Sequence, residues 1–307
     1  MYAQSMKTIL AASRLPFLVL APVCIFLACA SIYYSFQTFK VSLFACILAG
    51  AIFAHASVNL FNEYLDFQSG LDFKTKRTPF SGGSGALPSQ PNAAKTVLYA
   101  AIGTFLMTSS AGLYLLYDSY HRFDGLNISL LIIGFAGLIL ILLYTGPINR
   151  NPWLCLISPG LGFGFFMVYG SSSILLGYLP LSLFPAALLL FLLVNNLLLL
   201  NQLPDIEADS AIGRKHLWIA KGQAIGLNFY LFTTLLIPVL FLIAVLCKIW
   251  PILSVLALLP WGLTISAWRG AKVFTSEIGE HPEYLAMNVI ATLCVPSVLS
   301  LVLFLSA

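Results

Sequence analysis

Charged side chains are scarce in this sequence of 307 residues. They make up only 8% of the chain, whereas soluble domains carry about 25%. Hydrophobic residues account for 60%, and the mean hydropathy is +0.94. With so few charges, a pI of about 8.7 does not indicate a nucleic-acid-binding surface. The composition instead indicates an integral membrane protein without a sizeable soluble domain, and no nucleic-acid partner is expected.

CxxC cysteine pairs are also missing, and we expect no cleavable leader. The six cysteines all fall in apolar stretches, and none belongs to a CxxC pair. This pattern favours buried small hydrophobic residues over disulfides or metal ligands. The first apolar run, from about Leu15, has no clear small-x-small cleavage site before a polar region, so we expect it to be the first span.

Long apolar runs dominate the sequence. A helix needs about 20 apolar residues to cross the hydrocarbon core, and these runs are too long for barrel strands. We predict an all-α polytopic membrane protein in one domain, residues 1–307. Its nine transmembrane helices are expected near 15–36, 41–65, 93–117, 126–145, 153–177, 180–203, 223–246, 249–268 and 284–305. The fifth is rich in Gly and Ser, which predicts close helix packing or close approach to a ligand.

Basic residues divide unevenly between the loops. With nine spans and a cytoplasmic N-terminus, twelve Lys and Arg residues lie inside and three lie outside, namely Lys40, Arg122 and Lys248. This bias predicts a cytoplasmic N-terminus and an external C-terminus. We expect the chain to cross the cytoplasmic (inner) membrane, surrounded by membrane lipid.

Six of the eleven carboxylates lie in two short segments, each following an apolar run on the predicted cytoplasmic side. The first segment, 62–72, contains Asn62, Glu63, Asp66 and Asp72. The second segment, 201–213, contains Asn201, Asp205, Glu207 and Asp209. Residues four apart share one face of a helix, so Asn62 and Asp66 form a pair and Asn201, Asp205 and Asp209 form a ladder. Glu63 and Glu207 lie off these faces and rank lower as ligands, and Pro204 is expected to kink or restart the helix.

Each acidic segment is followed by a basic one, Lys74 to Arg77 in the first case and Arg214 with Lys215 in the second. The sequence therefore predicts two pseudo-repeated halves, and such repeats often place a binding site at their interface. Acids merely paired with neighbouring basic residues at the membrane surface would be the simpler explanation. Two matched acidic segments on the same side of the membrane instead favour a binding site.

Clusters of carboxylate and amide oxygens suit hard cations such as Mg²⁺, which is commonly held by one or two carboxylates together with substrate phosphates. Two such clusters facing each other could hold Mg²⁺ ions that bridge a diphosphate. The neighbouring Lys and Arg side chains would neutralise the remaining charge and make diphosphate a good leaving group.

Several single residues allow two interpretations each. Tyr144 is either a cavity residue that stabilises positive charge through its ring or an interfacial belt tyrosine. His55, in the second span, either contacts a substrate or bonds to a neighbouring helix. Arg14 either reaches a phosphate or holds the helix end at the membrane surface. Asn195 and Asn196 are explained by helix–helix hydrogen bonds, and His216 is expected at a loop surface.

The two acidic segments resemble the paired Asp-rich motifs of the UbiA superfamily of intramembrane prenyltransferases. The first matches as Asn62-Glu63-x-x-Asp66-x-x-x-x-x-Asp72 and the second as Asp205-x-x-x-Asp209-x-x-x-Gly213. The nine-span layout, Arg14-Leu15-Pro16 and Tyr144-Thr145-Gly146-Pro147 look like this family too. Within it, the spacing from Asp66 to Asp72 is similar to the 1,4-dihydroxy-2-naphthoate branch, although Glu63 stands where that branch more often has Asp.

The resemblance implies a UbiA-like helical bundle with a cytoplasmic cap and Mg²⁺-dependent transfer of a polyprenyl group to an aromatic small-molecule acceptor. In that case Asp66, Asp72, Asp205 and Asp209 bind metal, and Asn62, Asn201, Lys74, Arg77, Arg214 and Lys215 contact the diphosphate. Asp66, Asp205, Asp209 and Tyr144 are the expected catalytic residues. The acceptor would be 1,4-dihydroxy-2-naphthoate, as in menaquinone synthesis, or alternatively 4-hydroxybenzoate, a porphyrin-type ring or a glycerol-phosphate lipid. An ion-coupled transporter is the alternative from another class, because transporters also pair polar clusters at broken helices.

Overall fold

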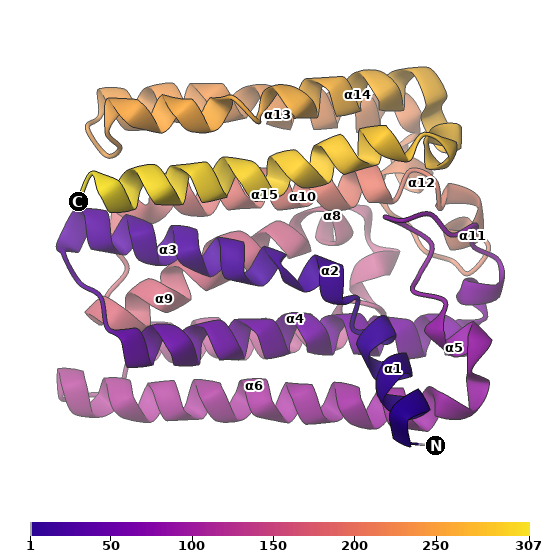
Figure 1. Ribbon diagram of the computed structural model, residues 1–307, viewed down its shortest axis with the longest axis horizontal. Helices are drawn as coiled ribbons and strands as arrows, with labels where there is room; N and C mark the ends of the chain where they lie inside the picture. Colours follow the sequence, from indigo (N-terminus) through magenta and orange to yellow (C-terminus); the bar gives the residue numbers. More distant parts are fainter. Residues whose placement is uncertain (1) are drawn as a thin grey trace.

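A computed structural model describes residues 2–307, and within that range the secondary structure is helical without strands. Figure 1 shows the long helices side by side along the longest axis of the molecule, with the N-terminus at one end and the C-terminus at the other. Among these described residues, eight helical segments are long and apolar enough to cross a membrane. A shorter apolar helix of 16 residues, α7, coincides with the fourth predicted span. The all-α membrane fold is confirmed, and each predicted span has a helical counterpart.

The spans in chain order are α2 and α3 (Leu15–Leu18, Leu20–Phe36), α4 (Val41–Ser69), α6 (Ala94–Phe123), α7 (Ile128–Leu143), α8, η4 and α9 (Pro152–Gly160, Leu161–Phe166, Met167–Leu176), α10 (Phe184–Asn201), α13 (Gln223–Leu246), η6 and α14 (Ile252–Leu258, Gly262–Phe274) and α15 (Pro282–Leu305). The short elements are α1 (Tyr2–Ala12), η1 (Leu71–Phe73), α5 (Ala86–Ser89), η2 (Pro91–Ala93), η3 (Ile148–Arg150), η5 (Leu181–Leu183), α11 (Ile206–Ser210), α12 (Leu217–Lys221) and η7 (Thr275–Glu280).

Helix α10 lies at the centre of the bundle and α6 at its edge. Of the apolar window of each span, 72% is buried in the α10 segment and only 11% in the α6 segment. Large apolar side chains such as Ile132 and Phe135 on α7 are more than half exposed. In water such a surface would drive aggregation, whereas lipid tails cover it at little cost.

The two mid-span asparagines of α10 are buried and serve helix packing, as expected. Asn195 Oδ1 accepts a hydrogen bond of 2.6 Å from the Gly160 amide of α8. Asn196 accepts one of 2.7 Å from Thr233 and donates one of 3.1 Å to Thr234, both on α13. These bonds satisfy polar groups that lipid could not, and they fix α8 and α13 against α10.

The glycine-rich fifth span contains a π-helix of six residues, η4, between α8 and α9. Here two glycines approach α10 closely. A Cβ at Gly160 would lie 2.6 Å from the carbonyl oxygen of Phe191, and one at Gly164 would lie 2.6 Å from that of Ala187. The small residues therefore permit close packing of two helices, the first of the two alternatives raised by the sequence.

The cap segment, residues 70–93, lies at the same end of the molecule as α1 (Figure 1). Its helix α5 packs through Leu87, which is fully buried against Ala12 of α1 and Leu60 of α4. Opposite it, α10 ends at Asn201 and the chain restarts as α11 after Pro204. The ladder of Asn201, Asp205 and Asp209 is thus split between a helix end, a turn and a short helix, and it does not lie on one continuous face.

Replacing Gly164 by Ala is expected to destabilise the protein, because backbone atoms of α10 stand where the new methyl group must go. Overpacking of this kind costs about 1–3 kcal/mol of unfolding free energy. Thermal unfolding in detergent measures the effect. The matched control is Gly103→Ala on α6, where nothing lies within 4 Å of the added Cβ. An equal melting temperature for the two variants would contradict the packing argument.

Candidate active site

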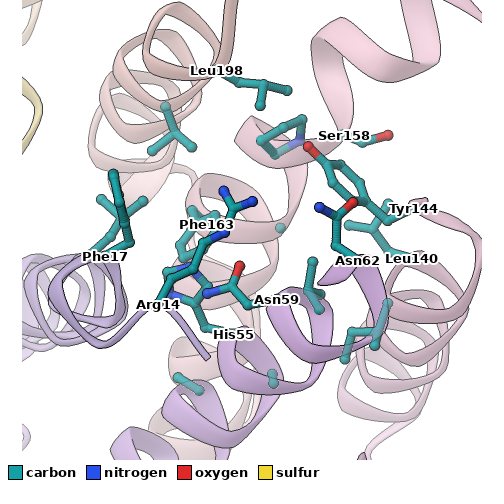
Figure 2. Close-up of a pocket in the computed structure, with 18 of the residues that line it drawn as sticks. Arg14, Phe17, His55, Asn59, Asn62, Leu140, Tyr144, Ser158, Phe163 and Leu198 are labelled. Carbon is teal, nitrogen blue, oxygen red and sulfur yellow. The ribbon is translucent and has the colours of Figure 1, made fainter. Parts of the chain in front are cut away.

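A cavity of about 470 Å³ runs between α4, α7, η4 and α10, and both acidic segments line it. Its walls are mostly apolar, with Leu, Ile, Val and Phe side chains from these helices. Its polar end contains Asp66, Asp72, Asp205 and Asp209, which come from four different elements or turns. Figure 2 shows Asn62 of α4 beside Tyr144, both facing the cavity. Tyr144 is therefore a cavity residue, the first of the two interpretations of its position.

Arg214 joins the two acidic segments. Its guanidinium pairs with Asp66 Oδ1 of α4 and, at 2.9 Å, with Asp209 Oδ1 of α11. All three side chains are largely buried, with 15%, 7% and 5% of the side chain exposed in turn. Charge-assisted hydrogen bonds in such surroundings are strong, and loss of one partner leaves a buried charge uncompensated. Arg214 therefore fixes the distance between the two halves of the site.

The first segment is ordered by hydrogen bonds along α4. Asn62 Nδ2 donates to Asp66 Oδ2 at 3.0 Å, four residues on, and Asn62 Oδ1 accepts from the Thr145 hydroxyl at 3.1 Å. The predicted i, i+4 pair is therefore present, and it is also tied to the end of α7. In the second segment, Asp205 Oδ2 accepts a hydrogen bond from the Gly82 amide at 3.1 Å, so the cap contacts this segment.

Glu63 is 1% exposed but holds the cap and does not line the cavity. Its carboxylate accepts hydrogen bonds from the Ser84 hydroxyl at 2.7 Å and from the Leu87 amide at 3.4 Å. Gly83, which directly precedes Ser84, has a φ of +78°, and a Cβ there would lie 2.6 Å from Asp72 Oδ1. A glycine is required because the loop passes so close to Asp72.

The oxygen atoms of the polar end fit a hard cation. Asp72 Oδ2, Asp205 Oδ1 and Asn201 Oδ1 are buried without a hydrogen-bond partner, which is costly for carboxylate and amide oxygens. No group of three His, Cys, Asp or Glu side chains among residues 2–307 converges closely enough to hold a metal alone. The site therefore fits Mg²⁺ bound by one or two carboxylates, with substrate phosphates and water completing its coordination.

Three of the basic residues expected at the site lie outside the cavity. Lys74, Arg77 and Lys215 are exposed, whereas Arg214 lines the cavity wall. The Arg77 guanidinium packs over Gly85 of the cap. Sequence proximity to the acidic segments could not separate these residues from Arg214, because only the turn after α11 directs Arg214 inwards.

His216 was expected at a loop surface, and that prediction is wrong. The residue is 1% exposed and lines the cavity, with Nε2 3.3 Å from Asp209 Oδ2. It stands just before α12, whose Leu217 and Trp218 are buried, and the burial of these two neighbours draws His216 inwards. The apolar pair directly after the basic residues is the sequence signal that could have indicated this.

Two of the acids outside the spans are poised to titrate near neutrality. Burial, together with the charges of Glu63 and Asp66, raises the pKa of Asp72 from its ordinary value of 3.8 to about 7. Burial and the charge of Asp209 raise the pKa of Asp205 to about 7, although the Gly82 amide opposes this. Cation binding would therefore compete with protons at these groups in the neutral range.

We expect Glu63→Ala to loosen the cap, because the Ser84 and Leu87 donors lose their buried acceptor. A loss of about 1–3 kcal/mol in local stability is expected. Hydrogen exchange over residues 78–89 and limited proteolysis there measure it. Glu207→Ala is the control, since Glu207 is exposed. Unchanged protection of the Leu87 amide in the Glu63 variant would contradict this role.

In EDTA, the double variant Asp72→Asn, Asp205→Asn is expected to gain stability relative to the parent protein as pH rises from about 4 to about 7. The unfolded chain releases these two protons near pH 3.8, whereas the folded protein retains them until about pH 7. The unfolding free energy of the parent therefore falls between about pH 4 and about pH 7, because the folded protein holds two protons that the unfolded chain has released. Melting curves of both proteins from pH 4 to 8 test the sign, and a constant difference between them would contradict it.

Comparison with known proteins agrees with this geometry. The profile of the UbiA prenyltransferase family matches residues 19–278. A 1,4-dihydroxy-2-naphthoate octaprenyltransferase of Bacillus subtilis (strain 168) is 30% identical over 184 residues, which cover 59% of this chain and 55% of that protein. The match thus spans about half the length of that relative.

Solved structures show the same fold. One, of a digeranylgeranylglyceryl phosphate synthase, superposes with a TM-score of 0.65 at 17% identity and covers 98% of this chain and 99% of the other. Another, of a UbiA homologue from Archaeoglobus fulgidus bound to DMAPP and Mg²⁺, gives 0.63 at 15% identity, with 98% and 100% covered. Since the family profile extends over most of the chain and includes both acidic segments, this protein belongs to the UbiA prenyltransferase family.

Proposed function

We propose that this protein transfers a polyprenyl group from polyprenyl diphosphate to an aromatic acceptor in a Mg²⁺-dependent reaction, with 1,4-dihydroxy-2-naphthoate of menaquinone biosynthesis as the acceptor. The observation that carries the proposal is the acid-lined end of a long apolar cavity within a membrane bundle. A ligand with a polyanionic head and an apolar tail matches this division. Family membership favours this hypothesis over an ion-coupled transporter.

We assign the diphosphate to the polar end. Bound Mg²⁺ would supply charge neutralisation that turns diphosphate into a better leaving group. Asp66, Asp72, Asp205 and Asp209 would hold the metal, and Asn62 and Asn201 would orient the phosphate oxygens. Arg214 balances two of the carboxylates and so keeps the net charge of the site low. Lys74, Arg77 and Lys215, exposed around this end, would attract the incoming diphosphate.

The apolar walls would hold the prenyl chain and keep water from the reactive carbon. Heterolysis of the allylic C–O bond would leave positive charge on that carbon, and diphosphate would depart with the bonding electron pair. An electron-rich ring carbon of the acceptor would then form the new C–C bond and release its proton, or its carboxylate as CO2, to restore the aromatic ring. The Tyr144 ring, which lines the cavity near Asn62, would stabilise the developing charge. The cap, held by Glu63, would limit hydrolysis by excluding water.

The choice of acceptor rests on similarity to the Bacillus subtilis enzyme over part of the chain, and the donor is supported by the DMAPP and Mg²⁺ bound to the Archaeoglobus homologue. We also propose that the polar end and the N-terminus face the cytoplasm, with the C-terminus outside. The excess of Lys and Arg on that side supports this orientation.

The proposal predicts Mg²⁺-dependent transfer from labelled polyprenyl diphosphate to 1,4-dihydroxy-2-naphthoate by the purified protein, abolished by EDTA. Asp205→Asn should lower turnover by at least about 100-fold, because it removes a charge from the phosphate site while preserving shape. Glu207→Gln, at an exposed position of the same segment, should retain activity. Transfer to a different aromatic acceptor would change the proposed acceptor and leave the proposed reaction type in place. Full activity of the Asp205 variant or in EDTA would refute the metal site.

A further inference from the structure

The apolar part of the cavity extends away from the acidic residues as an arm between α4, α6, α7 and α9. Along α7, the residues that line the arm begin at Leu130 and continue to Tyr144, beside the acidic end. At a rise of 1.5 Å per residue, this part of the helix is about 21 Å long. The arm is thus a deep apolar space whose far end lies well away from the diphosphate site.

Three large apolar side chains close the arm at the end opposite the acidic segments. Leu115 of α6, Leu130 of α7 and Ile174 of α9 line the cavity there, and each is at most 7% exposed. Among the described residues, no lining residue lies nearer to that end of these three helices. Helix α9 lies towards the end of the molecule opposite α5 and α11 (Figure 1). We call these three residues the floor of the arm.

The side chain of Asn127, directly before α7, holds the three helices together behind the floor. Its Nδ2 donates hydrogen bonds to the Ser119 hydroxyl of α6 at 2.9 Å and to the Ser173 carbonyl of α9 at 2.8 Å. Its Oδ1 accepts a hydrogen bond of 3.0 Å from the Leu130 amide. Asn127 and Ser119 are buried, so breaking these bonds would leave polar groups unsatisfied. The helices cannot separate at the floor without that cost.

Arg122 of α6 adds a second contact between α6 and α9. Its guanidinium donates a hydrogen bond of 2.6 Å to the Ile174 carbonyl and pairs with Asp118 at 2.5 Å. The two charged side chains are only 19% and 26% exposed, and charge-assisted bonds in partly buried surroundings are strong. The backbone of a floor residue is therefore fixed by a charged group, and the floor is rigid on all three helices.

Glycines widen the arm between its two ends. Gly112 of α6 and Gly134 of α7 line the cavity, and a Cβ at either position would have nothing within 4 Å. Gly170 of α9 lines it as well. Protein interiors are normally packed with few voids larger than a water molecule. Space that packing leaves open between apolar walls suits a flexible apolar ligand.

We infer that this arm receives the end of the polyprenyl chain and that the floor of Leu115, Leu130 and Ile174 sets the longest chain that the protein binds tightly. The inference rests on the proposed function and adds the length of the donor that the site selects. A chain shorter than the arm gains buried apolar area with each added isoprene unit. A longer chain meets a floor that is held by buried hydrogen bonds, so further units bring no gain.

The test is a chain-length profile of binding, which does not depend on turnover. The full-length protein in Mg²⁺ is titrated with unreactive thiodiphosphate analogues of geranyl, farnesyl, geranylgeranyl, hexaprenyl, octaprenyl and decaprenyl diphosphate. All titrations use one detergent, and each affinity of a variant is divided by that of the parent protein for the same ligand. Partition of long chains into the micelle therefore cancels, and only the effect of the substitution remains.

Ile174→Ala and Leu130→Ala deepen the arm. They are expected to bind the first analogue beyond the limit of the parent about 10-fold more tightly than the parent does, because further carbons become buried. Gly134→Leu fills the arm and should weaken the long analogues by about 10-fold or more, with the geranyl analogue unchanged. The matched controls are Leu131→Ala, at a position 45% exposed and outside the cavity, and Gly103→Leu, where nothing lies within 4 Å of the added Cβ. Both should keep the profile of the parent.

The outcomes separate the two proposals. The inference is overturned if neither the alanine variants nor Gly134→Leu changes the dependence of affinity on chain length. The chain would then leave for lipid past Val19, a cavity residue that is 44% exposed. Absence of Mg²⁺-dependent binding of the geranyl analogue by the parent would instead refute the proposed donor site, and prenyl alcohols of the same lengths would then test the floor.

Loss of stability cannot imitate the expected result. The alanine variants and the glycine variant are expected to shift the length limit in opposite directions, whereas a poorly folded protein would lose affinity for every length alike. Where an alanine variant does not fold, Gly134→Leu decides the question, because the added side chain meets open space and the floor itself stays intact.

Discussion

The architecture of the polar end depends on one buried cation held between two anions. Arg214 pairs with Asp66 on the second span and with Asp209 beyond the sixth, so a single side chain connects segments almost 150 residues apart. Without it, repulsion between buried carboxylates would push the two segments apart or force protons onto them. With it, acids from both halves of the chain can line one cavity. The remaining features of the site are arranged around this pair of contacts.

The cap adds further contacts to the acidic residues of both segments. Its loop places the Gly82 amide on Asp205 and passes Gly83 against Asp72, while Glu63 holds the other end of the loop through Ser84. Glu63, which the sequence ranks low as a ligand, thus holds the cap in place through hydrogen bonds. The cap covers the acidic residues that Arg214 holds together, and Arg14 lines a pocket beside the cap.

Burial changes what the acidic residues can do. In a soluble loop Asp72 and Asp205 would be fully ionised at neutral pH, but here their pKa values rise to about 7. The same burial leaves oxygen atoms without partners. A hard cation that brings phosphate oxygens with it resolves both conditions, because it stabilises the ionised carboxylates and completes their contacts. The site is thus suited to a ligand that arrives together with its metal.

The sequence alone determined the membrane fold, the positions of the nine helical segments and the two acidic segments, because apolar length and local spacing are properties of contiguous residues. The i, i+4 pair of Asn62 and Asp66 follows from the same local rule. Only the tertiary structure decided that Arg214 points inwards while Lys215 is exposed, that His216 is buried, and that Glu63 holds the cap. It also split the second ladder at Pro204 and placed Arg14 where two pockets meet. These features depend on the direction of side chains at helix ends and turns, where contacts between distant segments outweigh local periodicity.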